Sequence, residues 1–193
     1  TAFVALPASE LSAISLQREV DAIALTTPTP RGPLIMNILV LCTGNSARSI
    51  LLEAILNTQG AGRVTAYSAG SQPSGKVHPY SLKLLASRGY DTSMARSKSW
   101  DEFAAADAPK MDAVITVCAS AAGETCPIWP GAPVRAHWGV DDPAAAIEAD
   151  WPEAFEGAYR LLHLRAEAFL ESLAADPSQT DLKAALDAVG TLS

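Results

Sequence analysis

A cysteine and an arginine stand six positions apart, at Cys42 and Arg48, with only small residues between them. The intervening TGNSA joins an apolar run that ends at Cys42 to a stretch with helical spacing. A tight turn from strand to helix presents backbone N–H groups at the helix N-terminus, which bind anions and favour a thiolate. The guanidinium of Arg48 can hold two oxygens of a tetrahedral oxyanion. The pattern therefore predicts a nucleophilic thiolate inside an oxyanion site.

The small residues of the turn have expected supporting roles. Gly44 is expected to adopt a backbone angle closed to other residues, and Asn45 to tolerate the left-handed region and brace the turn. Ser49 is expected to hydrogen-bond the Cys42 sulfur. For Cys42 alone, a buried residue at the end of a strand is the simpler interpretation, and the chemistry of the turn favours the functional one. The oxyanion-binding set is then Thr43, Gly44, Asn45, Ser46, Ala47, Arg48 and Ser49.

Such a site needs a strand before it and a helix after it. The alternation of strands and helices predicts an α/β fold with a doubly wound, four-stranded parallel sheet flanked by helices. Ligands bind beyond the carboxyl ends of such strands, where Cys42 and Cys118 both lie. His78 precedes Pro79 and is expected to help begin the second helix. Strands are predicted over 37–42, 64–70, 112–118 and 133–140, and helices over 47–60, 78–90 and 153–174.

Three segments are distinguished along the chain. Residues 1–35 combine a helix-like stretch with a proline-rich linker and form an N-terminal extension, either the tail of a fused upstream domain or sequence ahead of the native start. The first methionine is Met36, directly before the first strong strand. Residues 36–174 form the predicted domain, and residues 175–193 a C-terminal tail with a short helix.

Composition limits the partners of this domain. A net charge of −7 argues against a nucleic-acid or anionic-membrane surface. No apolar run approaches the roughly 20 residues of a membrane-spanning helix, and the N-terminus lacks the pattern of a signal peptide. Three cysteines cannot form a closed set of internal disulfides. We therefore expect a cytoplasmic protein. We also expect it to be a monomer.

The segment NILVLCTGNSARS (37–49) resembles the phosphate loop of low-molecular-weight protein tyrosine phosphatases and of the arsenate reductases built on their fold. The stretches at 67–103, 111–131 and 136–144 resemble arsenate-reductase segments in the same order, so the resemblance covers roughly residues 36–172. It implies a phosphate loop after the first strand, with Cys42 as nucleophile and Arg48 as oxyanion clamp. It also implies that Asp142, which precedes Pro143, protonates the leaving oxygen. The adjacent Asp141 is interpreted as an exposed loop carboxylate.

Two features separate a reductase from a phosphatase within this resemblance. The phosphatases carry an aromatic residue after their Asp-Pro, whereas this chain has Ala144 and Ala145. A reductase must supply two electrons, and the CASAAGETC stretch offers Cys118 and Cys126 for this. Without such a role, Cys118 is a core residue at a strand end and Cys126 an incidental loop thiol.

The reaction implied by the resemblance is the reduction of arsenate, for which phosphate is an analogue, through a relay of Cys42, Cys118 and Cys126. Thioredoxin would then reduce the last disulfide, or a low-molecular-weight thiol would act, as glutathione with glutaredoxin or as mycothiol. No tightly bound cofactor is expected. The alternatives are a low-molecular-weight protein tyrosine phosphatase that hydrolyses phosphate monoesters and a non-catalytic oxyanion-binding module.

Some arsenate reductases of this group hold a potassium ion beside the phosphate loop. The resemblance aligns Asn45, Glu53 and Ser68 with ligands of that ion. Glu53 is otherwise an ordinary glutamate of the first helix, so both interpretations stay open.

Overall fold

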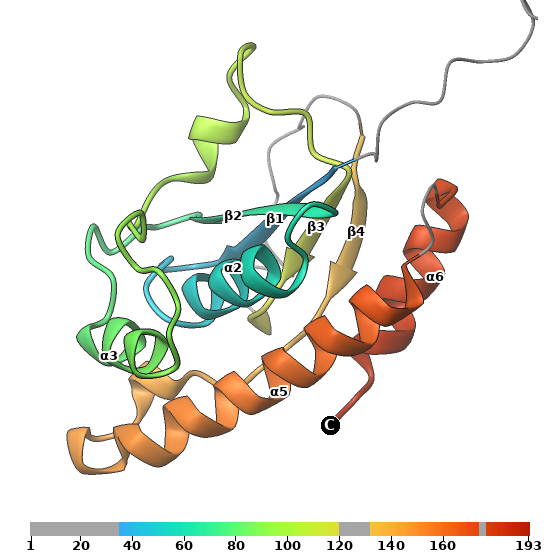
Figure 1. The fold of residues 1–193 in the computed structure, drawn as a ribbon. Helices are drawn as coiled ribbons and strands as arrows, with labels where there is room; N and C mark the ends of the chain where they lie inside the picture. The colour runs from blue at the N-terminus through green and yellow to red at the C-terminus, as the bar shows by residue number, and fades with distance from the viewer. Residues whose placement is uncertain (1–34, 120–131, 174–176) are drawn as a thin grey trace, which may run out of the picture. The chain divides into compact units, whose positions relative to one another are not determined.

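The computed structural model describes residues 35–119, 132–173 and 177–193, which contain a four-stranded parallel sheet (Figure 1). Its order is β2-β1-β3-β4, and every neighbouring pair is parallel, which confirms the predicted fold class. The strands are β1 (Met36–Cys42), β2 (Val64–Gly70), β3 (Ala113–Thr116) and β4 (Val134–His137). The helices are α2 (Arg48–Gln59), α3 (Pro79–Ser87), α5 (Trp151–Ser172) and α6 (Gln179–Gly190), with short 3-10 helices η1 (Trp100–Phe103), η2 (Pro143–Ala145) and η3 (Glu148–Asp150).

The continuous apolar run of β1 reflects its place inside the sheet. Ile38 and Val40 belong to the larger hydrophobic cluster, which includes the buried residues of α2 and α5. Leu39 and Leu41 belong to a second cluster with Phe103 of η1. Because successive side chains of a strand point to opposite faces, a strand covered on both faces needs apolar residues at every position.

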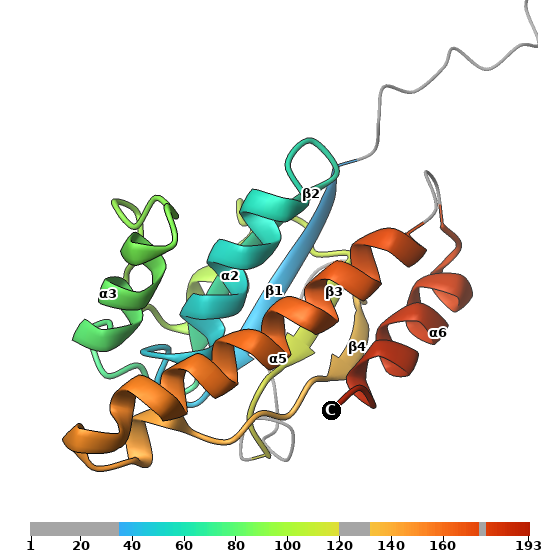
Figure 2. The same cartoon turned by 60° about the horizontal axis from the view of Figure 1, so that its bottom comes forward.

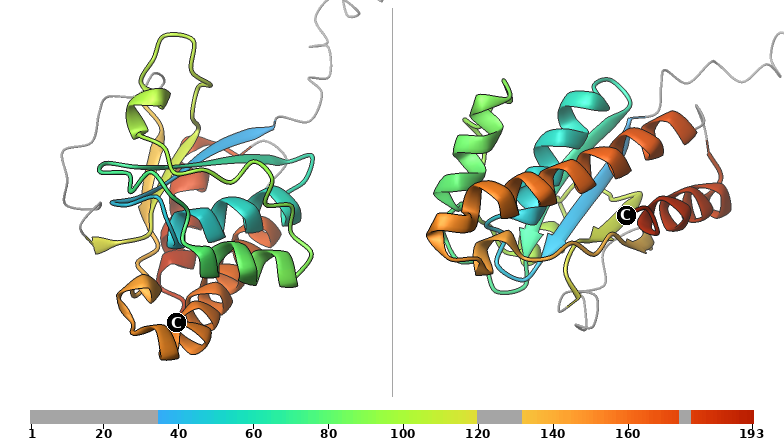
Figure 3. Two further views of the ribbon diagram at one scale, coloured as in Figure 1. Left: turned by 90° about the vertical axis from the view of Figure 1, so that its left-hand side faces the viewer. Right: turned by 90° about the horizontal axis from the view of Figure 1, so that it is seen from below.

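The α-helices gather on one face of the sheet (Figures 2 and 3). α5 runs across this face, with α2 on one side of it and α6 on the other. No helix in the described part of the chain combines the length and the apolar character needed to cross a membrane. The buried side chains of α5 recur at helical spacing and include Phe155, Tyr159, Leu162, Ala166 and Phe169.

The carboxyl ends of three strands meet at one edge of the sheet. β3 and β4 are shorter than the predicted strands, but backbone bonds continue past them, from Trp138 N to Thr116 O at 2.8 Å and from Val140 N to Val117 O at 3.1 Å. This extension keeps the segment after β4 beside the segment after β3. Cys42, Cys118 and the residues that follow β4 therefore lie at the same edge.

The C-terminal segment is packed. Ser178 caps α6 by accepting a hydrogen bond from Asp181 N, and α6 contacts β4 and α5. The hydrophobic core therefore extends beyond residue 174 and includes three residues of α6, namely Leu182, Leu186 and Val189.

Candidate active site

The turn between β1 and α2 surrounds the sulfur of Cys42 with donors. Asn45 is buried with a φ of 43°, and its N–H donates to Cys42 Sγ at 3.1 Å. Ser49 Oγ lies 2.9 Å from the same sulfur, as expected. Both contacts stabilise negative charge on the sulfur. The expectation that Gly44 supplies an unusual backbone angle is wrong, because Asn45 has the positive φ and Gly44 does not.

The carbonyl groups of the turn are held away from the sulfur. In a planar trans peptide, the C=O and the following N–H point in opposite directions. Hydrogen bonds hold the carbonyls of the turn, so the N–H groups that follow them, those of Gly44, Asn45 and Ala47, point in the opposite direction. The N–H of Asn45 thereby reaches the Cys42 sulfur. This orientation of N–H groups can bind an oxyanion. The bonds run from Gln72 N to Thr43 O (3.0 Å), from Ser74 N to Gly44 O (2.9 Å) and from His78 N to Ser46 O (3.0 Å).

Gly70, at the end of β2, makes room for this turn. A Cβ at this position would lie 2.4 Å from Thr43 O and 3.0 Å from Asn45 N. With any larger residue here, either β2 or the phosphate loop (residues 42–49) would have to shift. We did not predict this role, although the small residues that end the second strand, Ala69 and Gly70, are its signal in the sequence.

Arg48 and Asp142 are brought together across the mouth of the loop. Arg48 Nη2 lies 2.8 Å from Asp142 Oδ2, and Arg48 Nη1 donates to Val140 O at 2.9 Å. Asp142 also caps η2, since its Oδ1 accepts a hydrogen bond from Ala144 N. The carboxylate that reaches the guanidinium is thus that of Asp142, the residue that precedes Pro143.

Cys118 lies against the phosphate loop. Its side chain is buried, and its Sγ is 3.7 Å from Thr43 Oγ1. The third cysteine of the predicted relay, Cys126, lies outside the described residues. The structure therefore joins two of the three cysteines to one site.

The three predicted potassium ligands lie together behind the phosphate loop. Asn45 Nδ2 donates to Ser68 Oγ at 2.9 Å and to Ser49 Oγ at 3.0 Å. Ser68 Oγ donates to Glu53 Oε2 at 2.6 Å. These bonds form a polar chain from the half-buried Glu53 to the buried serine that contacts the Cys42 sulfur.

A lysine provides the positive charge of this cluster. The buried Lys98 places its Nζ 3.5 Å from Glu53 Oε1 and 3.3 Å from Ser68 Oγ, and its backbone N donates to Asn45 Oδ1 at 2.7 Å. Burial lowers the pKa of Lys98, and the charge of Glu53 opposes that shift. The ammonium takes the position of a cation among these oxygens, so the residues do not fit a bound potassium ion. Nothing in the sequence distinguished Lys98 from a surface lysine.

His78 begins α3, as predicted, and connects it to the phosphate loop. Its Nδ1 accepts a hydrogen bond from Tyr80 N at 3.1 Å. Its ring packs edge-on against the ring of Trp151, with 4.6 Å between the ring centroids. Trp151 Nε1 in turn donates to Ala146 O, just beyond η2. Burial lowers the pKa of His78, against the opposing charge of Asp142.

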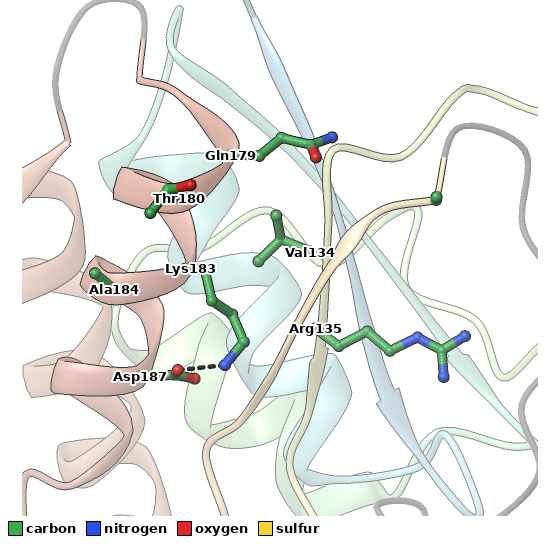
Figure 4. A pocket seen from close by; sticks show the side chains of 8 residues that line it. Val134, Arg135, Gln179, Thr180, Lys183, Ala184 and Asp187 are labelled. Atoms are coloured by element: carbon green, nitrogen blue, oxygen red, sulfur yellow. Dashed lines mark hydrogen bonds and ion pairs between the residues drawn. The ribbon is translucent and has the colours of Figure 1, made fainter.

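A separate cavity of about 530 Å³ lies between β4 and α6 (Figure 4). Lys183 and Asp187 form an ion pair on its α6 side. None of the predicted site residues lines it, so the candidate site is the phosphate loop rather than this cavity. The lining residues are Ala132, Val134, Arg135, Gln179, Thr180, Lys183, Ala184 and Asp187.

Known proteins are similar to this chain in sequence and in fold. Residues 37–179 match the low molecular weight phosphotyrosine protein phosphatase family. An arsenate reductase of Halalkalibacterium halodurans is 38% identical over 113 residues, which cover 58% of this chain and 78% of the relative. An arsenate reductase of Bacillus subtilis is 38% identical over 109 residues, which cover 56% of this chain and 75% of the relative. A solved structure described as an arsenate reductase in the phosphate binding state superposes with a TM-score of 0.57 at 26% identity, covering 72% of this chain and all of that one. The chain belongs to the low molecular weight phosphotyrosine protein phosphatase family, and it resembles the arsenate reductases within it.

Proposed function

We propose that this protein is an arsenate reductase that converts arsenate to arsenite, with Cys42 as the nucleophile. The observation that carries the proposal is the 3.7 Å contact between Thr43 Oγ1 and Cys118 Sγ, because it places a second buried cysteine against the loop of the first. Hydrolysis of a phosphate ester needs one cysteine, whereas two-electron reduction needs two thiols. The arsenate reductases among the relatives support the same substrate.

In the first step, the Cys42 thiolate attacks arsenic and an As–S bond forms. When arsenate replaces the Asp142 carboxylate on Arg48, Asp142 takes up a proton from solvent and donates it to one arsenate hydroxyl, which leaves as water. The remaining oxygens accept hydrogen bonds from Arg48 and from the N–H groups of the loop. The 2.8 Å ion pair of Arg48 and Asp142 keeps both groups at the loop before arsenate binds.

In the second step, the Cys118 thiolate attacks Cys42 Sγ. A Cys42–Cys118 disulfide forms, the As–S bond breaks, and its electron pair stays on arsenic, which leaves as arsenite. The Cys126 thiolate then attacks Cys118, so that a Cys118–Cys126 disulfide forms and the Cys42 thiolate is released. The role of Cys126 rests on its place in an Ala- and Gly-rich stretch after Cys118.

We propose thioredoxin as the reductant, because a protein dithiol suits a disulfide formed within the chain. Glutathione with glutaredoxin, or mycothiol, is the competing source of electrons. Either source operates in a reducing compartment, which favours the cytoplasm. We further propose that the protein acts as a monomer and that residues 1–35 are an extension dispensable for the chemistry.

A phosphatase acting on phosphate monoesters is the second candidate function. The phosphate loop and the Arg48–Asp142 pair would serve it equally well. Against it, the aromatic residue expected after Asp-Pro is replaced by Ala144 and Ala145. We therefore expect aryl-phosphate hydrolysis as a slow side reaction.

Two serine variants test the relay within one protein. Cys118→Ser is expected to abolish arsenite production with thioredoxin and to leave the hydrolysis of 4-nitrophenyl phosphate intact. Cys42→Ser is expected to abolish both, since each reaction begins with that thiolate. Normal arsenate reduction by Cys118→Ser with glutathione and glutaredoxin would show that an external thiol replaces the relay.

A further inference from the structure

The family match ends at residue 179, where α6 begins. α6 nevertheless packs against β4, the strand that leads to Asp142 (Figure 2). We call residues 139–142, between Trp138 and η2, the acid loop. The contacts of α6 and of α5 converge on the residues that enter this loop.

α6 holds the start of the segment. The side chain of Trp138 is fully buried, and its Nε1 donates to Leu186 O at 2.9 Å. Gly190 lies so close to β4 that a Cβ would come within 2.7 Å of His137 O. The backbone that leads into the acid loop is therefore fixed against two successive turns of α6.

Arg165 of α5 joins the acid loop to the end of the chain. The residue is 5% exposed, and its Nη1 donates to Gly139 O at 3.0 Å. Its Nε and Nη2 both donate to Leu192 O, at 3.0 and 2.6 Å. Burial lowers the pKa of Arg165, so the guanidinium is held in place at a cost in desolvation. A buried guanidinium bonded to two carbonyls fixes the distance between the segments that carry them.

The other side of the acid loop faces the phosphate loop. Val140 O accepts a hydrogen bond from Arg48 Nη1, and Asp142 pairs with Arg48 Nη2. Gly139 is thus bonded to Arg165 and the next residue, Val140, to Arg48. The acid loop is held between two guanidinium groups, and only Arg48 belongs to the phosphate loop.

We propose that Arg165, together with α6, is a positioning element that aims the carboxylate of Asp142 at the leaving oxygen. This inference rests on the proposed function for the role of Asp142. A C-terminal helix outside the family match would thereby act on the general acid without touching substrate. Loss of Arg165 would release Gly139 and let the carboxylate move from its productive geometry.

The test compares two aryl phosphates that differ only in how much they need a general acid. The phenol of phenyl phosphate, with a pKa of about 10 as in tyrosine, is a poor leaving group that needs protonation. 4-Nitrophenol is more acidic than phenol, so it leaves as the phenolate with little need for protonation. The ratio of kcat/KM for phenyl phosphate to kcat/KM for 4-nitrophenyl phosphate covers the step in which the phenol leaves and therefore reports the general acid. Loss of overall folding would lower both values together.

Asp142→Asn is expected to lower this ratio by about 100-fold, the usual contribution of a general acid. Arg165→Met is expected to lower it by about tenfold, and Arg165→Lys, which can still donate to a carbonyl, to restore much of it. The matched control is Arg63→Met, because Arg63 Nη1 also donates to a carbonyl, that of Leu170, at 2.9 Å and away from the acid loop. The control is expected to keep the wild-type ratio.

If Arg165→Met lowers the rates for phenyl phosphate and 4-nitrophenyl phosphate by the same factor, the positioning role is overturned. If that variant does not fold, Trp138→Phe decides, because it keeps an aromatic ring in the core while it removes the bond to Leu186 O and part of the packing against α6. A lowered ratio in Trp138→Phe supports the inference and an unchanged ratio refutes it. Failure of the wild-type protein to reduce arsenate, with the ratio still dependent on Arg165, would refute the reductase and leave the inference standing.

Discussion

The phosphate loop and the acid loop meet at one ion pair, yet different kinds of contact hold them. In the phosphate loop, backbone N–H groups of nearby segments bind the carbonyls of Thr43, Gly44 and Ser46. The acid loop is held chiefly by long side chains, from Arg48 on one side and Arg165 on the other. The first arrangement orients many weak donors at one point, and the second sets the position of a single carboxylate. An anion site needs several donors aimed at one point, whereas a proton donor needs one carboxyl group held in a fixed position.

The largest expected effect comes from replacing the one residue that serves both loops. Arg48→Lys keeps a positive charge near Asp142 but loses the planar fork that bonds Val140 O and the oxyanion together. We expect kcat for arsenite production to fall by about 100-fold or more, as on removal of an oxyanion donor. Phosphate affinity, measured by calorimetry, should fall as well. Near-normal affinity in this variant would contradict the assigned clamp.

The phosphate loop can be disturbed alone through Gly70. In Gly70→Ala, the new Cβ would meet the backbone at Thr43 O, 2.4 Å away, and one of the two segments must shift. We expect the free energy of unfolding to fall by about 1–3 kcal/mol, and phosphate binding to weaken because the N–H groups lose their alignment. Urea denaturation and calorimetry measure the two effects. Gly157→Ala is the control, because its Cβ would meet nothing within 4 Å.

The parts that could be predicted from the sequence are those in which neighbouring residues carry the signal. The roles of Cys42, Asn45 and Ser49 depend on a turn only a few residues long, and apolar periodicity located the strand before it and the helix after it. Lys98 and Arg165 carry no such signal, because their partners are distant in the sequence. In an amphipathic helix, an arginine is expected on the exposed side, and only the packing of α6 shows that Arg165 is buried.

The buried charge behind the phosphate loop gives an effect on stability similar in size to that of Gly70→Ala. With the Lys98 ammonium between Glu53 and Ser68, the thermal stability of the wild-type protein should be the same in KCl as in NaCl. Lys98→Met leaves Glu53 without this partner, and we expect a loss of about 3 kcal/mol. Potassium should restore part of this loss, because the oxygens around Glu53 would then lack a cation.

Thermal unfolding in matched KCl and NaCl measures this difference. Lys76→Met, a change of an exposed lysine, is the control and should respond to neither salt. A wild-type protein whose stability or turnover depends on potassium would show that the ammonium does not occupy the cation position.

The smallest expected effect concerns His78, the residue that caps α3. His78 accepts a hydrogen bond from Tyr80 N through Nδ1, which it can do only while that nitrogen carries no proton. Its pKa is lowered by burial from the ordinary value of 6.5, so below about pH 6.5 the unfolded chain binds a proton that the folded chain does not. The contribution to stability is therefore complete above pH 6.5 and is lost as the pH falls below it. In His78→Asn, an amide oxygen caps α3 at any pH, so the free energy of unfolding should decline less between pH 7.5 and 5.5. Urea denaturation at the two pH values compares the proteins, and equal declines would mean that protonation of His78 does not break the cap.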